Sequence, residues 1–518
     1  MKTCLFFIMI MFASDIPSYA QDLEKVKETN TIPGGNGYPF DLTVSNNKLF
    51  FLANDNSNYP LLWVTGGTDA STQLIQPAAV AAASIRNLIA YHNKLYFSCN
   101  DNVNGQELWI SDGSAAGTGL FKDVYAGSAG SYPQAFTVAN DKLFFMTNGV
   151  DGIKKMYVSD GTIAGTILIK NGVDLFNGLA TFAILNTNIY FISDDGTGAG
   201  YGLWKSDGTL GGTSLVSNVL TPGVSGGNYA VLNNKLYFSG FDYTNGSELW
   251  VTDGSVTGTH IVKNLGIDNG GILYSGSPQN MVVYNSKIYF SGWDNIHGNE
   301  LFVTDGSSTG TQLVKDIFPG TDGSQPKLIV YNGLLYLICQ FTQELWKSDG
   351  TNAGTSLVKA IAPYSKFAGI WNNKLYFTND FDYSVWQSDG SATGTGLITV
   401  NNTSNPINSY GADQMFTEYN AELYFSGQCP VITGGYELVK LTLGSAALKT
   451  FTFTGNGNWS NPANWSGNAV PPATILSGYT VIINGQCILD IAEHMQSGAS
   501  VTVLSGKSLV ITGSLTSL

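Results

Sequence analysis

One pattern recurs along most of the chain, and this repeat restricts the fold more than any other feature. One copy reads NKLYFS at residues 93–98, GQELWISDGS at residues 105–114 and GT at residues 117–118. Successive copies lie 40 to 52 residues apart, as measured between the glycines of the turn: Gly67, Gly113, Gly161, Gly208, Gly254, Gly306, Gly350 and Gly390. A chain of 518 residues with such a period is expected to form an array of small units rather than one large core.

Each copy divides into four short segments in which apolar and polar residues alternate. In one copy these segments are residues 135–139, 142–146, 155–159 and 166–170. Alternation with period two predicts β-strands, whereas helical repeats would need apolar residues about 3.6 positions apart. Asn140-Asp141 and the later Asp-Gly pair are typical of tight hairpin turns, because these residues tolerate positive φ. Four strands in about 40–50 residues is the period of a β-propeller blade.

The tryptophan of the repeat marks a packing position. A large aromatic residue occupies it in eight copies: Trp63, Trp109, Tyr157, Trp204, Trp250, Phe302, Trp346 and Trp386. Because tyrosine and phenylalanine replace tryptophan here, the position is expected to fill a core rather than to recognise a ligand through the indole N–H.

The number of copies predicts how the array closes. Nine second strands are expected to begin at Leu49, Leu95, Leu143, Ile189, Leu236, Ile288, Leu335, Leu375 and Leu423. The ninth copy lacks the Asp-Gly turn and a fourth strand. Residues 26–30 and the later Tyr38-Pro39 parallel residues 121–124 and Tyr132-Pro133, so the N-terminal strand can complete the last blade. We predict an all-β propeller over residues 22–443 with nine four-stranded blades, or eight as the alternative, closed by the N-terminal strand.

The repeat resembles a known family. Residues 344–351 (ELWKSDGT) with Gly354-Thr355, and residues 204–209 (WKSDGT) with Gly212-Thr213, match its motif. The sequence is similar in this respect to the ELWxxDGT repeat family of exported bacterial proteins, often from Bacteroidetes. The resemblance covers about residues 22–443. It implies the repeat architecture and is nearly silent about activity.

The character of the sequence changes after Gly444. Trp459 and Trp465 precede Pro471-Pro472, and short strands are predicted at residues 480–483, 487–491, 500–504 and 508–512. Residues 449–518 are therefore expected to form a small C-terminal β domain, either β-helix-like or sandwich-like.

The N-terminus predicts export. Met1-Lys2-Thr3 is followed by an apolar run at residues 4–13 and by Ser18-Tyr19-Ala20, which is the pattern of a signal peptide over residues 1–20. No apolar run elsewhere is long enough for a transmembrane segment. The mature protein is expected to be extracellular or on the outer cell surface, with the periplasm as the alternative. Cys99 and Cys339 occupy the same strand position of different copies, so they are expected to be free thiols.

Charge excludes several classes of partner. The net charge of −14 disfavours binding to nucleic acid or to anionic lipid. Arg86 is the only arginine, which leaves little scope for bidentate clamps on phosphate or carboxylate. The protein is expected to be a monomer.

No residue pattern predicts catalysis or a cofactor. The four histidines, His92, His260, His297 and His494, lie in unrelated contexts and form no zinc-binding motif. The aspartate of each Asp-Gly turn occurs once per blade, and glycoside hydrolysis needs two carboxyl groups about 5–10 Å apart. These aspartates are therefore interpreted as acceptors for turn amides.

Calcium is the one metal for which the sequence offers ligands. The loop before the tryptophan strand combines Asp, Asn, Gly and Glu at short spacing, and calcium prefers such oxygen ligands. The candidate ligands are Asp101, Glu107, Asp242, Glu248, Asp294 and Glu300. The same residues also form Asx turns without any metal, so turn formation is the alternative.

Two functions from different classes fit this sequence. The first is a non-enzymatic binding, scaffold or adhesin-like protein that recognises a glycan or a surface protein through its blade loops. The alternative is a polysaccharide-degrading enzyme, a glycoside hydrolase or lyase, with its site at the channel mouth. Loops that depart from the repeat, around residues 194–195, Trp293 and residues 380–382, are where such a site would be sought.

Overall fold

The computed structural model describes residues 21–517 except for 58, 76–83, 149–150, 174–181, 195–200, 219–228, 267–274, 363, 399–406, 410–415, 429–434, 444–449, 467–470, 472–473, 476–479 and 496–499. The predicted signal peptide lies outside the described residues. Contacts divide the chain into two compact units, of which one comprises Glu24–Thr399 with Asn405–Lys440 and the other includes Leu441–Leu518.

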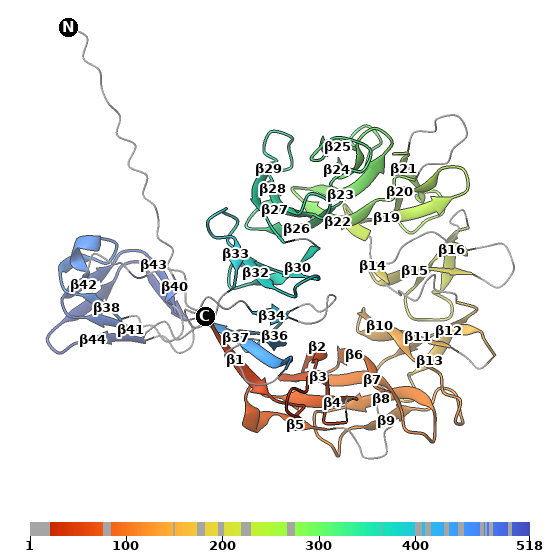
Figure 1. The fold of residues 1–518 in the computed structure, drawn as a ribbon, viewed down its shortest axis with the longest axis horizontal. Coiled ribbons are helices and arrows are strands. Elements are labelled where there is room, and N and C mark those ends of the chain that lie inside the picture. Colours follow the sequence, from red (N-terminus) through yellow and green to blue (C-terminus); the bar gives the residue numbers. More distant parts are fainter. Residues whose placement is uncertain are drawn as a thin grey trace, which may run out of the picture. The chain divides into compact units, whose positions relative to one another are not determined.

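The first unit is a ring of nine antiparallel sheets, which we number as blades 1 to 9 (Figure 1). Blade 1 contains β2 (Phe40–Ser45), β3 (Lys48–Asn54), β4 (Pro60–Thr65) and β5 (Gln73–Leu74). Blade 2 contains β6 (Arg86–Tyr91), β7 (Lys94–Asn100), β8 (Gln106–Ser111) and β9 (Gly119–Lys122). Blade 3 contains β10 (Gln134–Ala139), β11 (Lys142–Asn148), β12 (Lys154–Ser159) and β13 (Ile167–Asn171). Blade 4 contains β14 (Ala183–Leu185), β15 (Asn188–Asp194), β16 (Tyr201–Ser206) and β17 (Ser214–Ser217).

The remaining blades follow the same order. Blade 5 contains β18 (Tyr229–Leu232), β19 (Lys235–Asp242), β20 (Gly246–Thr252) and β21 (His260–Lys263). Blade 6 contains β22 (Gln279–Tyr284), β23 (Lys287–Asp294), β24 (Gly298–Thr304) and β25 (Gln312–Lys315). Blade 7 contains β26 (Pro326–Tyr331), β27 (Leu334–Cys339), β28 (Glu344–Ser348) and β29 (Ser356–Ala360). Blade 8 contains β30 (Ser365–Trp371), β31 (Lys374–Asn379), β32 (Val385–Ser388) and β33 (Gly396–Leu397). Blade 9 contains β34 (Asn408–Ser409), β35 (Thr417–Tyr419), β36 (Glu422–Gln428), β37 (Glu437–Leu443) and β1 (Gln21–Lys27).

Strand direction divides the connections of the ring between two faces. The first strand of each blade lies nearest the centre of the ring, and the following strands run antiparallel outward (Figure 1). The turns between the first and second strands and those between the third and fourth strands therefore lie on one face, which we call the Asp-Gly face. The turns between the second and third strands and the linkers from blade to blade lie on the opposite face, which we call the linker face.

Neighbouring blades pack through apolar side chains that alternate along their strands. Phe50 and Leu62 of blade 1 share one core with Phe97 of blade 2, and the same arrangement continues around the ring. The aromatic residue at the tryptophan position packs on the phenylalanine of the second strand, as in the stacked pair of Phe377 and Trp386 with ring centroids 5.8 Å apart. This contact confirms the interpretation of the tryptophan as a packing residue.

A second contact between blades joins a tyrosine to the glycine of a turn. Gly350 and Gly390 have φ of 91° and 90°, and a Cβ atom there would collide with the hydroxyl group of Tyr289 or Tyr336 from the preceding blade. At the junction of the ends of the ring, Gly67 of blade 1 faces the hydroxyl group of Tyr424 of blade 9 in the same way. The last and first blades are therefore packed like any other neighbouring pair.

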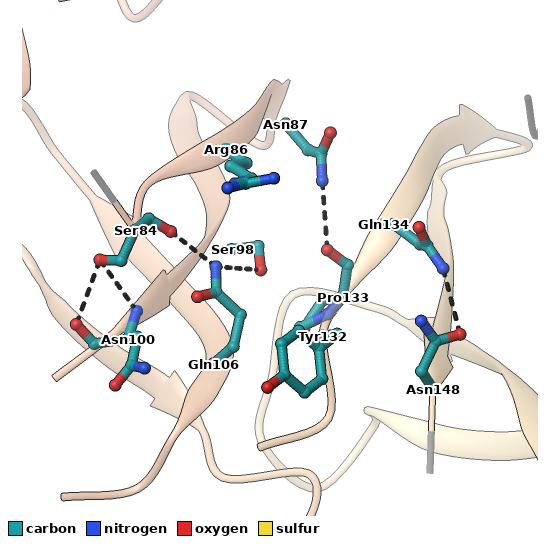
Figure 2. A pocket seen from close by; sticks show the side chains of 10 residues that line it. All are labelled: Ser84, Arg86, Asn87, Ser98, Asn100, Gln106, Tyr132, Pro133, Gln134 and Asn148. Atoms are coloured by element: carbon teal, nitrogen blue, oxygen red, sulfur yellow. Dashed lines mark hydrogen bonds between the residues drawn. The ribbon is translucent and has the colours of Figure 1, made fainter. Parts of the chain in front are cut away.

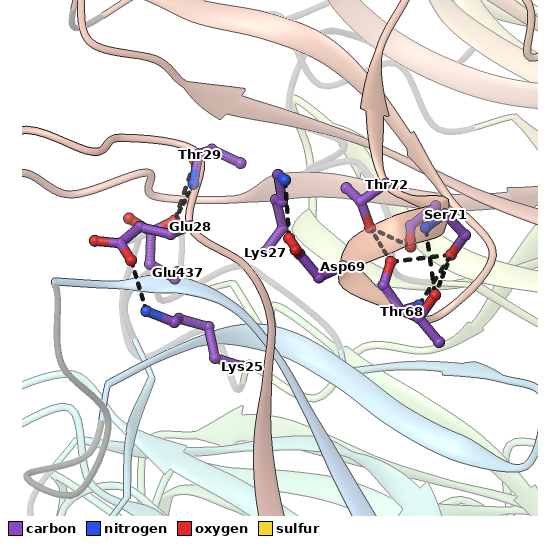
Figure 3. Close-up of polar contacts among 10 residues, drawn as sticks. Lys25, Lys27, Glu28, Thr29, Thr68, Asp69, Ser71, Thr72 and Glu437 are labelled. Carbon is purple, nitrogen blue, oxygen red and sulfur yellow. Dashed lines mark hydrogen bonds and ion pairs between the residues drawn. The ribbon is translucent and has the colours of Figure 1, made fainter.

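The N-terminal strand closes the ring. β1 is the outermost strand of blade 9, next to β37. The Glu437 carboxylate accepts hydrogen bonds from the Thr29 N–H (2.9 Å) and from the Gly37 N–H (3.0 Å), and Lys27 forms an ion pair of 2.8 Å with Asp69 of blade 1 (Figure 3). Nine blades and closure by this strand were both predicted, and the structure confirms them over the eight-blade alternative.

The C-terminal unit consists of parallel sheets. Its strands are β38 (Thr450–Phe453), β39 (Asn456–Asn458), β40 (Thr474–Ile475), β41 (Thr480–Ile483), β42 (Gln486–Leu489), β43 (Ala492–Met495), β44 (Ser500–Val503), β45 (Ser508–Ile511) and β46 (Ser514–Ser517). They form three sheets, in the orders β38-β41-β44, β39-β42-β45 and β40-β43-β46, around a core that contains Trp459 and Trp465. This is the strand pairing of a parallel β-helix rather than of an antiparallel sandwich.

Candidate functional site

The Asp-Gly face repeats one hydrogen-bond network. In blade 2, the Asp112 carboxylate accepts hydrogen bonds from the Ser114 backbone N–H (2.8 Å) and hydroxyl (2.7 Å), and the Gly113 N–H donates to Ser111 Oγ (3.0 Å). The same two contacts to carboxylate recur at Asp160, Asp207, Asp253, Asp305, Asp349 and Asp389. These contacts confirm the interpretation of the repeated aspartates as turn acceptors.

Hydrogen bonding also shifts the pKa of these aspartates. The side-chain hydroxyl donor two residues later, supported by backbone donors, lowers the pKa below its usual value at Asp112, Asp160, Asp207, Asp253, Asp305 and Asp349. A general acid in glycoside hydrolysis needs a raised pKa instead. These carboxylates are therefore suited to holding the turn and not to donating a proton.

The linker face has a repeated framework of its own, built on buried glutamates. Glu248 lies at the start of the Glu-Leu-Trp motif, and its carboxylate accepts hydrogen bonds from the N–H groups of Leu265 (2.8 Å) and Gly276 (2.9 Å). Glu107, Glu300 and Glu437 bind the linker to the next blade in the same manner. All four side chains are fully buried, and burial raises their pKa, for Glu107 and Glu248 to about 7.

The predicted calcium ligands separate into two sets of contacts. Asp101 accepts hydrogen bonds from the N–H groups of Val103 and Asn104, and Asp242 and Asp294 cap their own turns likewise. The glutamates paired with them in the prediction, Glu107, Glu248 and Glu300, hold the linkers instead. Within the described ranges, no three His, Cys, Asp or Glu side chains gather as a metal site would require. The calcium assignment stays a prediction.

The other predicted reactive residues have structural surroundings. Cys99 and Cys339 are free and buried, and burial raises the pKa of the Cys99 thiol to about 12. Of the loops in which an enzyme site was sought, Asp195 lies outside the described residues, and Asp380 forms an ion pair of 3.0 Å with Lys366. Asp382 accepts a hydrogen bond from the Ser384 N–H.

Another repeated element of the linker face is a linker residue whose backbone conformation is the same in several blades. Tyr132, immediately before the first strand of blade 3, has a φ of 52°, and its N–H donates to the carbonyl oxygen of Gln106 (2.9 Å). Ser277 and Gln325 occupy equivalent places with φ of 39° and 52° and matching backbone hydrogen bonds. Positive φ is unfavourable for such residues, so the surrounding framework must impose it. The side chain at this position is again a tyrosine at Tyr38, whose N–H donates to the Tyr436 carbonyl oxygen (2.9 Å), but it differs at Ser277 and Gln325.

Exposed aromatic side chains gather on the linker face. Among the described residues of the propeller, the aromatic side chains with the greatest exposure, 47–77%, are Tyr59, Tyr132, Tyr243, Phe341, Tyr364 and Phe381. Four of them lie in turns between second and third strands, and Tyr132 and Tyr364 lie in linkers. None lies on the Asp-Gly face, where the exposed apolar residues of the Asp-Gly turns are aliphatic, as at Leu210.

A polar cavity opens on the linker face between blades 2 and 3 (Figure 2). Its volume is about 510 Å³, which lies within the usual range for small-molecule sites of about 300–1,000 Å³. The residues that line it are Ser84, Arg86, Asn87, Ser98, Asn100, Gln106, Tyr132, Pro133, Gln134 and Asn148. The lining thus combines five amide side chains with one guanidinium and one phenol, and it contains no carboxylate.

Sequence reasoning did not find this cavity. Its residues come from both strands and linkers of two blades, and Arg86 and Asn148 are 62 positions apart. The one available signal was Arg86 itself, a single arginine placed at the start of a first strand.

Comparisons with known proteins find similarity at a low level. No family model and no curated protein sequence matches the chain, so the resemblance to the ELWxxDGT family stays a prediction. Among solved structures, the chain is similar to the Dos1 propeller, with a TM-score of 0.41 and 12% identity over 82% of this chain and 96% of that one. It is also similar to AztD from Citrobacter koseri, with a TM-score of 0.35 and 12% identity over 74% and 95% of the two chains.

A third similar structure belongs to a longer protein. Puromycin hydrolase matches with a TM-score of 0.36 and 10% identity over 83% of this chain, and this chain spans only 64% of its length. Within the described residues, the structure has no apolar helix of the length needed to cross a membrane.

Proposed function

We propose that this chain is an exported, non-enzymatic binding protein that recognises glycan through the linker face of its propeller. The observation that carries the proposal is the placement of the six most exposed aromatic side chains of the propeller's described part, Tyr59, Tyr132, Tyr243, Phe341, Tyr364 and Phe381, on that face. Each ring leaves apolar surface in water, although Tyr243 and Phe341 each contact one neighbouring ring, Phe241 at 5.5 Å and Phe318 at 4.8 Å between centroids.

The chemistry of the linker face suits a sugar. A sugar ring presents hydroxyl groups along its edge and C–H groups on its face, so it pairs with amide side chains and with flat aromatic surfaces together. The cavity offers amides from Asn87, Asn100, Gln106, Gln134 and Asn148, and Tyr132 adds an aromatic ring. Tyrosine is also a common anchor in protein interfaces, so a surface protein is the other partner that this face could take.

Binding without turnover is favoured over hydrolysis by the make-up of the cavity. Apart from the phenol of Tyr132, its ten lining residues include no carboxyl, imidazole, thiol or amino group that could act as a general acid or base. The repeated aspartates lie on the opposite face with lowered pKa. A glycoside hydrolase or lyase elsewhere on the propeller is the alternative function.

A glycan array combined with a polysaccharide hydrolysis screen tests the proposal. We expect the purified protein to bind at least one class of glycan and to release no reducing sugar from it. Tyr243→Ser and Phe381→Ser are expected to weaken binding tenfold or more, whereas Leu210→Ser on the Asp-Gly face serves as the matched exposed control and leaves binding unchanged.

Three results would contradict the proposal. Turnover of any polysaccharide would establish the enzyme instead. Absence of glycan binding would remove the proposed ligand class. A loss of binding caused by Leu210→Ser and not by the linker-face variants would place recognition on the Asp-Gly face.

A further inference from the structure

We propose that the cavity between blades 2 and 3 binds an acidic sugar, with Arg86 pairing with the carboxylate of a uronic acid and Tyr132 contacting the face of the sugar ring. This inference rests on the proposed glycan-binding function and specifies the ligand of one part of the linker face. The sequence did not predict this site, because a chain with one arginine has little scope for bidentate binding of carboxylates. One arginine inside a cavity is nevertheless sufficient to bind one carboxylate.

The first argument is the charge of Arg86. It is the only arginine in a chain with a net charge of −14, and its side chain is exposed at the start of β6. No described acidic side chain forms an ion pair with it. Figure 2 shows its guanidinium between the Gln106 side of the cavity and the segment at Pro133. A planar guanidinium binds a carboxylate through two parallel hydrogen bonds, which a lysine cannot reproduce.

The amide side chains around Arg86 are already held in place by hydrogen bonds. Gln106 Nε2 donates to the Ser84 carbonyl oxygen (2.6 Å) and to Ser98 Oγ (2.9 Å), and Asn87 Nδ2 donates to the Pro133 carbonyl oxygen (3.3 Å). Gln134 Nε2 donates to Asn148 Oδ1 (3.2 Å). These contacts leave the side-chain oxygen Oε1 of Gln106 and the side-chain NH₂ group of Asn148 as an acceptor and a donor for sugar hydroxyls. A fixed lining reduces the entropy lost on binding.

The third argument is the conformation of Tyr132. Its positive φ is held by the hydrogen bonds that the N–H groups of Ser131 and Tyr132 donate to one carbonyl oxygen, that of Gln106 (2.9 Å each). Its ring is 53% exposed, although the adjoining Pro133 contributes to the same cavity wall. The same residue, Gln106, therefore positions both the amide floor and the aromatic side of the cavity.

The junction between blades 6 and 7 provides an internal control. Its framework is the same, because Asn280 Nδ2 donates to the Pro326 carbonyl oxygen (3.3 Å) as Asn87 does to Pro133, and Ser291 bonds to Asn299. By strand register, Gln279 is equivalent to Arg86, since they pair with Ser291 and Ser98. Gln325 is equivalent to Tyr132. In other blades these places hold Lys327, opposite Ile338, and Lys366, opposite Thr378, and a tyrosine recurs at Tyr38. The framework is thus constant while the residues on it vary between junctions, and Arg86, as the single arginine of the chain, is the one that offers a guanidinium.

Titration calorimetry with matched ligands tests the inference. The probes are oligogalacturonate, its fully methyl-esterified form, alginate oligosaccharide and a sulfated, carboxylate-free oligosaccharide. We expect binding of at least one of the two uronates, and oligogalacturonate binding at least tenfold tighter than its ester, because esterification removes the charge and adds one methyl group while it keeps the sugar ring and its hydroxyl groups. Arg86→Gln is expected to weaken uronate binding at least tenfold, Arg86→Lys to restore only part of it, and Tyr132→Ser to weaken it severalfold. Gln279→Ala is the control and leaves binding unchanged.

The outcomes separate this inference from the function on which it rests. If neutral glycans bind through Tyr243 and Phe381 while neither uronate binds, or while Arg86→Gln has no effect, the acidic-sugar assignment is wrong and the glycan-binding function stands. Preference for the sulfated oligosaccharide would overturn the assignment of a carboxylate. If no glycan binds at all, both proposals fail. Circular dichroism and the thermal midpoint of each variant, both expected to match the parent protein, show that losses do not arise from misfolding.

Discussion

The two faces of the propeller use the same repeat in different ways. On the Asp-Gly face, the aspartate, glycine and hydroxyl residues of the turns form the same contacts in seven blades, with little variation in side chain. On the linker face, the repeated contacts lie beneath the surface, where buried glutamates such as Glu248 hold the linkers. Above them the residues vary in part, since tyrosine occurs at Tyr38 and Tyr132 while Ser277 and Gln325 occupy equivalent places.

This difference shows how a repeat can hold a ring together and still vary its surface. The turns of the Asp-Gly face satisfy their backbone groups with their own side chains, so a ligand has few free groups to bind there. The linkers of the other face are satisfied from below by glutamates, so their upper side chains are free to change without loss of the framework. Variants that each change a residue of one face test this difference.

The largest effect is expected from removing a linker anchor. Glu248→Ala leaves the N–H groups of Leu265 and Gly276 without their acceptor in a buried place, which should lower the free energy of unfolding by about 3 kcal/mol. Guanidinium unfolding at pH 6 measures the loss. Glu344→Ala is the control, because Glu344 has the same place in the repeat but accepts a hydrogen bond from Trp346 within its own strand (2.9 Å). Equal losses in the two variants would show that linker anchoring is not the cause.

A glycine of the Asp-Gly face should matter nearly as much. Gly390→Ala combines an unfavourable positive φ with a collision against the Tyr336 hydroxyl of the preceding blade, and we expect a loss of about 2–3 kcal/mol. Gly211→Ala, next to the equivalent turn of blade 4 with open space around it, should change stability by less than about 0.5 kcal/mol. Thermal unfolding of both variants decides the matter; similar midpoints would contradict a role for the contact between blades.

Stability should also depend on pH through the linker anchors. Burial raises the pKa of Glu107 and Glu248 to about 7, so the folded protein retains protons that the unfolded chain releases above its ordinary glutamate pKa. The protonated glutamates stabilise the folded protein fully below the pKa of the unfolded chain, and this stabilisation is lost as the pH rises through 7. We expect each of the two glutamates to lower the free energy of unfolding by about 2 kcal/mol from pH 5 to pH 8. The variant with Glu107→Gln and Glu248→Gln should show a flatter profile, and an unchanged slope would assign the titration to other groups.

An aspartate of the turns should have a smaller effect. Asp207→Ala removes the acceptor for the N–H and hydroxyl of Thr209 at an exposed turn, which should cost about 1 kcal/mol and leave glycan binding unchanged. Urea unfolding and the array measure the two quantities. If binding fell with Asp207→Ala as much as with Tyr243→Ser, the assignment of ligand binding to the linker face alone would be wrong.

The smallest effect on stability is expected from an exposed ring of the linker face. Tyr243 is 76% exposed, so Tyr243→Ser should change the free energy of unfolding by less than about 0.5 kcal/mol even though it weakens binding. Paired unfolding and binding measurements on this variant test the point. A loss of stability above 1 kcal/mol would mean that the ring serves the fold and not a ligand.

Much of the propeller follows from the sequence, because its determinants are local and repeated. The period of the Asp-Gly turns, the alternation of the strands and the parallel between Tyr38-Pro39 and Tyr132-Pro133 predicted nine blades and their closure. Asp112 and its equivalents were recognised as turn acceptors, since the residues that they bind lie two positions away in the chain.

Contacts between residues far apart in the chain could be found only from the tertiary structure. Glu107, Glu248 and Glu300 were grouped with nearby aspartates as calcium ligands, because their actual partners lie 17 to 28 positions away in the next linker. The cavity joins Arg86 to Tyr132 across a blade junction that no spacing in the sequence reveals. Local hydrogen bonding and strand periodicity therefore determined the architecture, whereas burial and the packing of separate blades decided which side chains became anchors and which remained available to a ligand.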